Sequence, residues 1–183
     1  RMSPKRVVFA EADHYKILKA AQITRDDGVA VPILLGNKER IERMIAENGL
    51  DLEDIQIIDC RSEAETDRRA RFADTFFAKR KRRGLTYPEA TKIMRERNYF
   101  GAAMVQNGEA DVLISGLTRN YAATIKPALQ VIGTNPMVKN IAGMYVFITK
   151  NGPLFLADTT VTYDPTAEEL VEITVMVAKA VER

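Results

Sequence analysis

The stretch that decides the fold is RVVFAEADHYKILKAAQITRDDGVAVPILLG, residues 6–36. Residues 6–10 are a short β-rich run, and a helix is predicted from about Asp13 to Asp27, with Gly28 as its C-cap. Residues 31–35 are a second apolar run, in which the proline favours a strand start or an edge strand because it lacks a backbone N–H donor. Strand, helix and strand in this order predict an α/β layered fold with a largely parallel sheet.

The same alternation continues along the chain. Further strands are predicted at residues 55–58 and 111–114, and further helices at residues 37–48, 62–84, from 86 onward and at 99–106. Two of these helices begin with the pattern of a capping box, Ser62 to Glu65 and Thr86 to Glu89. A first α/β subdomain is therefore expected over residues 1–135.

A change of organisation is expected after that subdomain. Residues 141–149 and 154–160 are β-rich runs joined by a short turn segment, which is typical of an antiparallel hairpin. A last helix is predicted to begin at Asp164 and Pro165, with aspartate as N-cap and proline in the first turn. Since its broad apolar face has no following strand to pack on, we interpret residues 136–183 as the truncated start of a second subdomain.

The composition is that of an ordinary globular protein, with 183 residues, 46% hydrophobic and 28% charged. The net charge of +2 argues against a nucleic-acid partner. The single Cys60 excludes an internal disulfide framework, and with only one histidine in the chain no metal site is expected. No apolar run reaches membrane-spanning length, so a cytoplasmic protein is expected.

The best candidate for a ligand site lies in residues 114–133, which predict a strand end, a turn at Ser115 and Gly116, and then a helix. In this geometry backbone N–H groups and the helix dipole can hold a phosphate group. Arg119 and Lys126 add positive charge. The spacing alone leaves an anion site and a solvated loop equally open.

The position of Lys126 depends on where that helix begins. Thr124 as N-cap would place Lys126 and Pro127 in the first turn, where proline is tolerated. A cation in the first turn is mildly unfavourable unless an anion lies nearby.

The strongest charge cluster is Lys79 to Arg83, which is most simply a solvated helix C-terminus. A nucleic-acid patch and an arginine that reaches a phosphate are the alternatives. Elsewhere, His14 is interpreted as a surface residue and Cys60 as a small core residue. Asp158 is a candidate base, whereas Asp164 is better explained as a cap.

Several motifs, in conserved order along the whole chain, resemble the phosphate acetyltransferase (phosphotransacetylase) family. They are Val7–Glu11, Pro32–Gly36, Arg83–Thr86, Gly108–Asp111, Ser115–Gly116 and Ala157–Thr174. The last is the most discriminating, and it is most similar to the phosphotransacetylase-like C-terminal domain of large bacterial NADP-dependent malic enzymes.

The resemblance implies a three-layer α/β/α fold of the isocitrate/isopropylmalate dehydrogenase type, with an acetyl-CoA and phosphate cleft between two subdomains. The family's active-site arginines fall on Arg80 and on Lys126, where lysine is a departure. The binding residues implied are thus Arg80, Ser115, Gly116, Arg119 and Lys126. The catalytic serine and aspartate of the family have no counterpart here, so no catalytic residue is assigned.

Two functions follow from the resemblance. The first is a regulatory domain that senses acetyl-CoA and supports a homo-oligomer, in a malic enzyme that decarboxylates malate to pyruvate. NADP and a divalent metal would then bind the parent enzyme's other domains, and this fragment would hold no cofactor. The second is the N-terminal half of a phosphate acetyltransferase, which moves acetyl between CoA and phosphate. A nucleic-acid binder that uses Lys79 to Arg83 is a third, weaker alternative.

Overall fold

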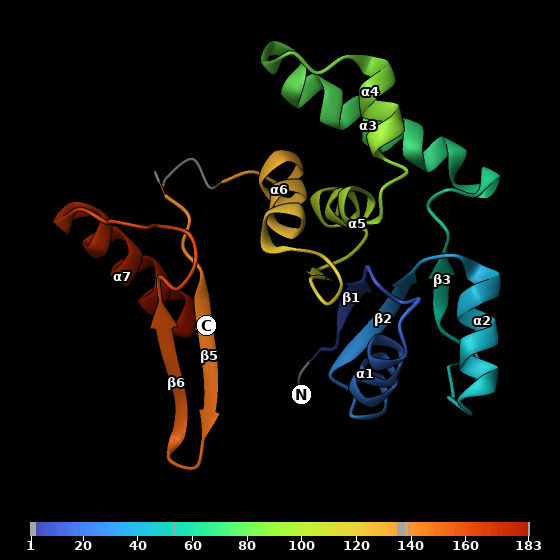
Figure 1. Ribbon diagram of the computed structural model, residues 1–183, viewed down its shortest axis with the longest axis horizontal. Helices are drawn as coiled ribbons and strands as arrows, with labels where there is room; N and C mark the ends of the chain where they lie inside the picture. The colour runs from blue at the N-terminus through green and yellow to red at the C-terminus, as the bar shows by residue number, and fades with distance from the viewer. Residues whose placement is uncertain (1–2, 53, 135–137, 139, 183) are drawn as a thin grey trace. The chain divides into compact units, whose positions relative to one another are not determined.

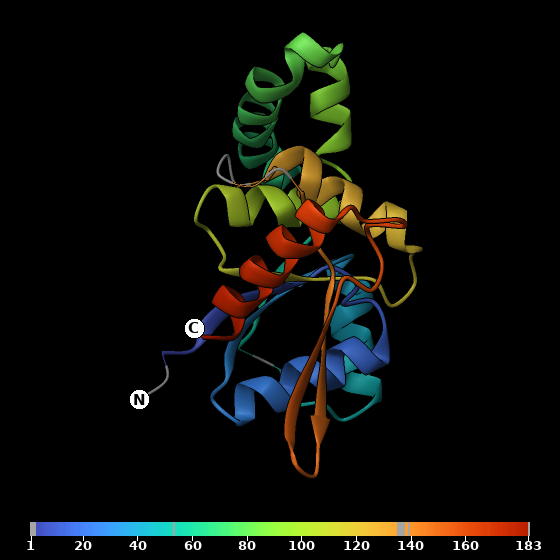
Figure 2. The ribbon, with the colours of Figure 1, turned by 90° about the vertical axis from the view of Figure 1, so that its left-hand side faces the viewer.

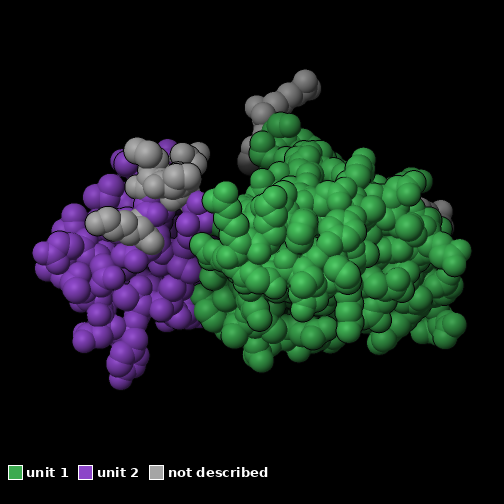
Figure 3. Space-filling view, turned by 90° about the horizontal axis from the view of Figure 1, so that it is seen from above, with its two compact units in different colours: residues 1–133 green, residues 134–183 purple. Residues whose placement is uncertain are grey.

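The computed structural model describes residues 3–52, 54–134, 138 and 140–182. The chain forms two compact units, residues 1–133 and residues 134–183, which Figure 3 shows in green and purple. The boundary predicted between residues 135 and 136 lies outside the described residues.

Unit 1 is built on a four-stranded parallel sheet with the strand order β3-β2-β1-β4 (Figure 1). The strands are β1 (Lys5–Phe9), β2 (Ala30–Leu35), β3 (Gln56–Ile58) and β4 (Val112–Ile114). Val8 of β1 stands opposite Ile33 of β2 on one side and Leu113 of β4 on the other. The parallel sheet predicted from residues 6–36 is confirmed.

Helices cover both faces of this sheet, as Figures 1 and 2 show. The helices of unit 1 are α1 (Tyr15–Asp26), α2 (Lys38–Glu47), α3 (Thr66–Arg80), α4 (Tyr87–Ile93), α5 (Arg97–Gln106) and α6 (Tyr121–Val131). Because side chains alternate along a strand, Val7 and Phe9 pack with α1 and α2, whereas Val8 packs with α3 to α6. The three-layer α/β/α arrangement is therefore confirmed.

Pro32 lies inside a central strand, so the expected strand start or edge is wrong. It stands opposite Val7 of β1, but β3 pairs with β2 only from Ile33 onward. At Pro32 the β3 side of the strand thus has no ladder to interrupt, and the missing N–H donor costs no strand hydrogen bond there.

Of the two capping boxes predicted, only the one at Thr86 and Glu89 forms. The Ser62 side chain makes no cap hydrogen bond, and a 3-10 turn (Glu63–Glu65) precedes α3. The buried Arg69 instead donates to the carbonyl oxygens of Cys60 (2.9 Å) and Ser62 (2.5 Å) and fixes the start of α3. The C-terminus of α3 passes into a second 3-10 turn, Lys81–Arg83, which confirms the helix end predicted at the charge cluster.

Unit 2 contains the predicted antiparallel hairpin, β5 (Met144–Thr149) and β6 (Gly152–Ala157), followed by α7 (Ala167–Val181). The N-cap predicted at Asp164 is wrong, because Thr166 and Glu169 form a capping box that begins the helix. Every residue of β5 is exposed, including Val146, Phe147 and Ile148. Along the described part of the chain, no helix has both the length and the apolar content needed to cross a bilayer. The cytoplasmic location stays a prediction.

Candidate anion-binding cleft

Helix α6 begins earlier than the sequence predicts. Asn120 is its N-cap, and the Asn120 side chain accepts a hydrogen bond from the backbone N–H of Ala123 (2.8 Å). Pro127 consequently lies in the helix interior, buried in the core, and Lys126 lies beyond the first turn. The placement of Thr124 as N-cap is wrong because asparagine is at least as strong a cap and the Thr124 hydroxyl donates back to the Asn120 carbonyl oxygen (3.1 Å).

The loop between β4 and α6 already holds an anion, the carboxylate of Glu11. The backbone N–H groups of Gly116 (2.8 Å), Leu117 (2.7 Å) and Thr118 (2.8 Å) donate to it, as does the Thr118 hydroxyl. Ser115 donates its hydroxyl hydrogen to the side-chain oxygen of Asn98 (2.8 Å). The backbone N–H groups that were predicted to bind a phosphate therefore donate to the side chain of Glu11 instead.

The electrostatics of Glu11 reflect this enclosure. Burial raises its pKa, but the hydrogen bonds from the Thr118 hydroxyl and from three backbone N–H groups lower it, and the net pKa lies below the usual value. Glu11 is therefore a permanent carboxylate near neutral pH.

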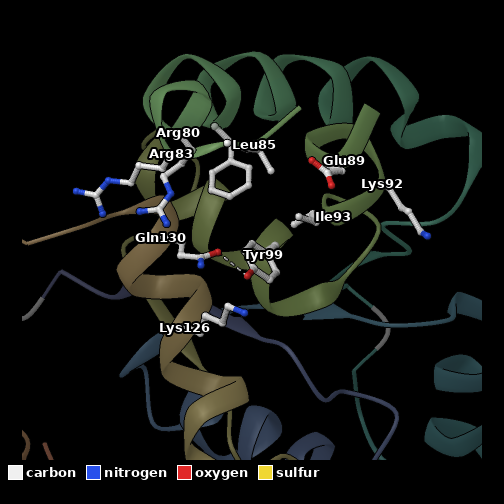
Figure 4. Close-up of a pocket in the computed structure, with 11 residues that line it drawn as sticks. Arg80, Arg83, Leu85, Glu89, Lys92, Ile93, Tyr99, Lys126 and Gln130 are labelled. Atoms are coloured by element: carbon white, nitrogen blue, oxygen red, sulfur yellow. Dashed lines mark hydrogen bonds between the residues drawn. The ribbon is translucent and has the colours of Figure 1, made fainter. Parts of the chain in front are cut away.

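A cationic hollow of about 620 Å³ is lined by residues of α3, α4, α5 and α6 and of the turn between α3 and α4 (Figure 4). Its charged lining residues are Arg80, Arg83, Lys92, Lys126 and Glu89. The single carboxylate in this set, Glu89, accepts hydrogen bonds from the N–H (2.9 Å) and hydroxyl (2.7 Å) of Thr86. None of the four cations forms an ion pair with a carboxylate of the described residues.

A second hollow of about 420 Å³ adjoins the first, because Tyr99 and Lys126 line both. Its lining includes Arg119, whose guanidinium lies 3.9 Å from the carboxylate of Glu96. We call the two hollows together the cleft. The structure thus brings Arg80, Lys126 and Arg119 to one cleft, whereas Ser115 and Gly116 do not line it and lie in the loop that precedes α6.

The sequence reasoning missed two polar residues that connect α5 with α6 across the cleft. The Tyr99 hydroxyl donates to the side-chain oxygen of Gln130 (2.7 Å), and Figure 4 shows this bond above Lys126. Burial and the Glu96 carboxylate raise the pKa of Tyr99, while the nearby Arg80 lowers it. Tyr99 is therefore a neutral hydrogen-bond donor. No local sequence pattern marks either residue, since their helices meet only in the folded chain.

The remaining candidates have structural roles. Cys60 is buried, which confirms the predicted core residue, and burial raises the pKa of its thiol to about 11. His14 caps α1 by accepting from the N–H of Lys16 (3.3 Å). Asp158 accepts backbone hydrogen bonds that include one from Gly143 (2.9 Å); burial opposes its ionisation, but these bonds hold its pKa well below the usual value. Among the described residues, no group of acidic, histidine or cysteine side chains is arranged to hold a metal ion.

The fold and the cleft define a class, namely three-layer α/β proteins with a cationic cleft near the carboxyl end of a parallel strand. The chain belongs to the phosphate acetyl/butaryl transferase family, whose model matches residues 1–183. Among its relatives, the NADP-dependent malic enzyme of Escherichia coli is 35% identical over 100% of this chain and 24% of its own length. The phosphate acetyltransferase of Synechocystis sp. is 34% identical over 92% of this chain and 24% of its own length.

The fold has a close match among solved structures. The EutD phosphotransacetylase from Staphylococcus aureus superimposes with a TM-score of 0.85 and 28% identity over 97% of this chain. This chain spans 52% of that protein and about a quarter of the two relatives named above. The predicted family is confirmed, and the chain covers only part of the length of these relatives.

Proposed function

We propose that the cleft of unit 1 binds the phosphate groups of an acyl-CoA such as acetyl-CoA, or inorganic phosphate. The observation that carries the proposal is the set of four cations, Arg80, Arg83, Lys92 and Lys126, that surround one hollow without a carboxylate partner among the described residues. Like charges gathered in one concavity repel one another, and a bound polyanion removes that repulsion.

The chemistry of the cleft suits phosphate recognition. Arg80 and Arg83 can each offer a planar pair of N–H donors, whereas Lys126 offers a point charge. Tyr99 and Gln130 add neutral polar groups that fix orientation. The apolar side chains of Leu85 and Ile93 complete the wall and accommodate a non-polar part of the ligand.

Two roles for this binding are considered, regulation by acetyl-CoA and transfer of an acetyl group, and we favour regulation. The malic enzyme relative supports a module that senses acetyl-CoA within a larger protein, where NADP, a divalent metal and malate would bind other domains. Lys126 also favours sensing, because the resemblance implies an arginine at this position in the family's enzymes and lysine lacks the paired N–H donors with which arginine binds phosphate. A homo-oligomer of the complete protein is part of the same proposal.

Transfer of acetyl between CoA and phosphate is the second candidate. The match to the phosphotransacetylase structure over 97% of this chain favours it. In that case Arg80 and Lys126 would position the substrates, and residues outside this chain would carry the proton transfers.

Calorimetry on the 183-residue chain tests the binding step, with acetyl-CoA, CoA and inorganic phosphate as titrants. Arg80→Ala and Lys126→Ala should each weaken CoA binding by about tenfold, the effect of losing one charge-assisted hydrogen bond. Lys81→Ala, which changes the same charge on an exposed residue outside the cleft, should leave the affinity unchanged. Absence of heat with all three titrants would refute the proposal.

The two roles separate in a full-length protein that contains this chain. A sensing domain predicts that acetyl-CoA shifts the rate of malate turnover and that no acetyl phosphate forms. A transferase predicts acetyl phosphate from acetyl-CoA and phosphate, with no dependence on malate.

A further inference from the structure

The starting observation is the burial of Glu11, which is 5% exposed. A buried carboxylate is costly unless it is paired or hydrogen-bonded. Among the described residues no lysine or arginine forms an ion pair with Glu11. Its charge is instead balanced by the four donors of residues 116–118.

The topology explains why Glu11 reaches this loop. Strands β1 and β4 are parallel neighbours, so their carboxyl ends meet at one edge of the sheet, and the N–H of Ala10 extends the ladder to the carbonyl oxygen of Ile114 (3.1 Å). Gly116 has a φ of +115°, which turns the chain so that three successive N–H groups point at one place. Such a concavity of amides binds an anion, and here the Glu11 carboxylate occupies it.

The loop held in this way leads directly to the cleft. The backbone N–H of Thr118 donates to the Glu11 carboxylate, and Thr118 immediately precedes Arg119. Asn120 caps helix α6, which carries Lys126. The bond from Ser115 to Asn98 fixes the other end of the loop against α5. Two cations of the cleft wall therefore depend on the conformation of residues 115–118.

We propose that Glu11 is a positioning residue: its carboxylate substitutes for a bound phosphate at the loop amides and thereby places Arg119 and Lys126 to meet the ligand with their side chains. The consequence for the ligand rests on the proposed function. The anion is recognised by movable side-chain cations, and the loop amides take no part in its binding.

Anion rescue in the 183-residue chain tests this proposal. Glu11→Ala empties the concavity, so amide hydrogen exchange at residues 116–118 should accelerate at least tenfold, and about 100 mM formate should slow it again by refilling the site. Glu11→Gln keeps the volume of the side chain but loses its charge. In this variant amide exchange at residues 116–118 should also accelerate, and formate should not slow it. Glu47→Ala, a charge change on an exposed residue of α2, is the matched control, with chloride at equal ionic strength.

The second part of the experiment measures CoA binding by calorimetry in the same chloride and formate buffers. Glu11→Ala should weaken CoA binding by about tenfold relative to the wild-type chain in chloride, and formate should restore it toward the wild-type value measured in formate. Unchanged amide exchange at residues 116–118 in both Glu11 variants would show that Glu11 does not hold this loop. Faster exchange with unchanged CoA affinity would overturn the positioning role. A wild-type chain that gives no heat with CoA, acetyl-CoA or inorganic phosphate would instead overturn the proposed function, and the exchange data would still decide whether Glu11 holds the loop.

Discussion

The ammonium group of Lys79 donates hydrogen bonds to the carbonyl oxygens of Val131 (2.7 Å) and Ile132 (2.6 Å). These carbonyl groups lie at the C-terminus of α6, where backbone acceptors lack helical partners and a cation is favourable. Lys79 precedes Arg80 on α3, so the contact ties together the two helices that supply the cleft with Arg80 and Lys126. Lys79, the first residue of the charge cluster, thus has a structural role in joining α3 to α6.

Loss of this tie should weaken both the fold and ligand binding. Lys79→Met keeps the length of the side chain but removes the donors, and should lower the free energy of unfolding by about 1 kcal/mol. CoA affinity should fall several-fold because α3 and α6 are no longer held at a fixed spacing. Urea denaturation and calorimetry measure the two effects, with Lys81→Met as a control of equal charge. Equal behaviour of the two variants would show that the contact contributes nothing.

The fold follows from local signals to a large extent, and the errors share one cause. Residues 6–36 already specify a parallel βαβ unit, because alternation and glycine punctuation are local properties. The caps predicted at Ser62, Thr124 and Asp164 are wrong, since each has a competing residue within a few positions. Which residue caps a helix depends on the tertiary contacts that fix the loop before it. The spacing of residues in the sequence does not specify these contacts.

The site was less predictable. Arg80 and Lys126 were placed by family resemblance, and the structure brings both to one hollow. Glu11 belongs to the motif Val7–Glu11, yet nothing in the sequence connects it with residues 116–118. That link arises only because β4 joins the sheet beside β1, a long-range pairing that no local pattern specifies.

The proposed function implies that a lysine at position 126 binds phosphate less tightly than an arginine would. Lys126→Arg should tighten binding of CoA or phosphate by roughly tenfold, because a guanidinium adds a second parallel hydrogen bond to the same anion. Calorimetry on the 183-residue chain measures the change. Lys92→Arg is the matched substitution on the same wall, and a smaller gain there would show that position 126 is specific. A loss of affinity in Lys126→Arg would indicate that the cleft is shaped around lysine.

The ion pair between Arg6 and Asp111 predicts a pH-dependent stability. The Arg6 guanidinium donates to Asp111 at 2.9 Å and 3.2 Å, and the Arg6 backbone N–H donates at 2.8 Å. The side-chain bonds of Arg6, followed by its backbone N–H, lower the pKa of Asp111 from 3.8 to about 2. Since the folded pKa lies below the unfolded one, the stabilisation is complete above about pH 4 and is lost as the pH falls toward 2.

Asp111→Asn should therefore destabilise the chain at pH 6 and lose that deficit progressively below pH 4, where the wild-type carboxyl group begins to take up its proton in the unfolded state. Urea denaturation between pH 6 and pH 3 measures the difference, and a carbon-detected NMR titration of Asp111 gives its pKa directly. Since both side chains are partly exposed, the difference should shrink in high salt. Asp54→Asn, the same substitution at an exposed residue away from this ion pair, is the matched control. A deficit that is independent of pH would mean that the neutral asparagine loses only its hydrogen bonds, and that the charge of Asp111 contributes nothing to the joining of β1 and β4.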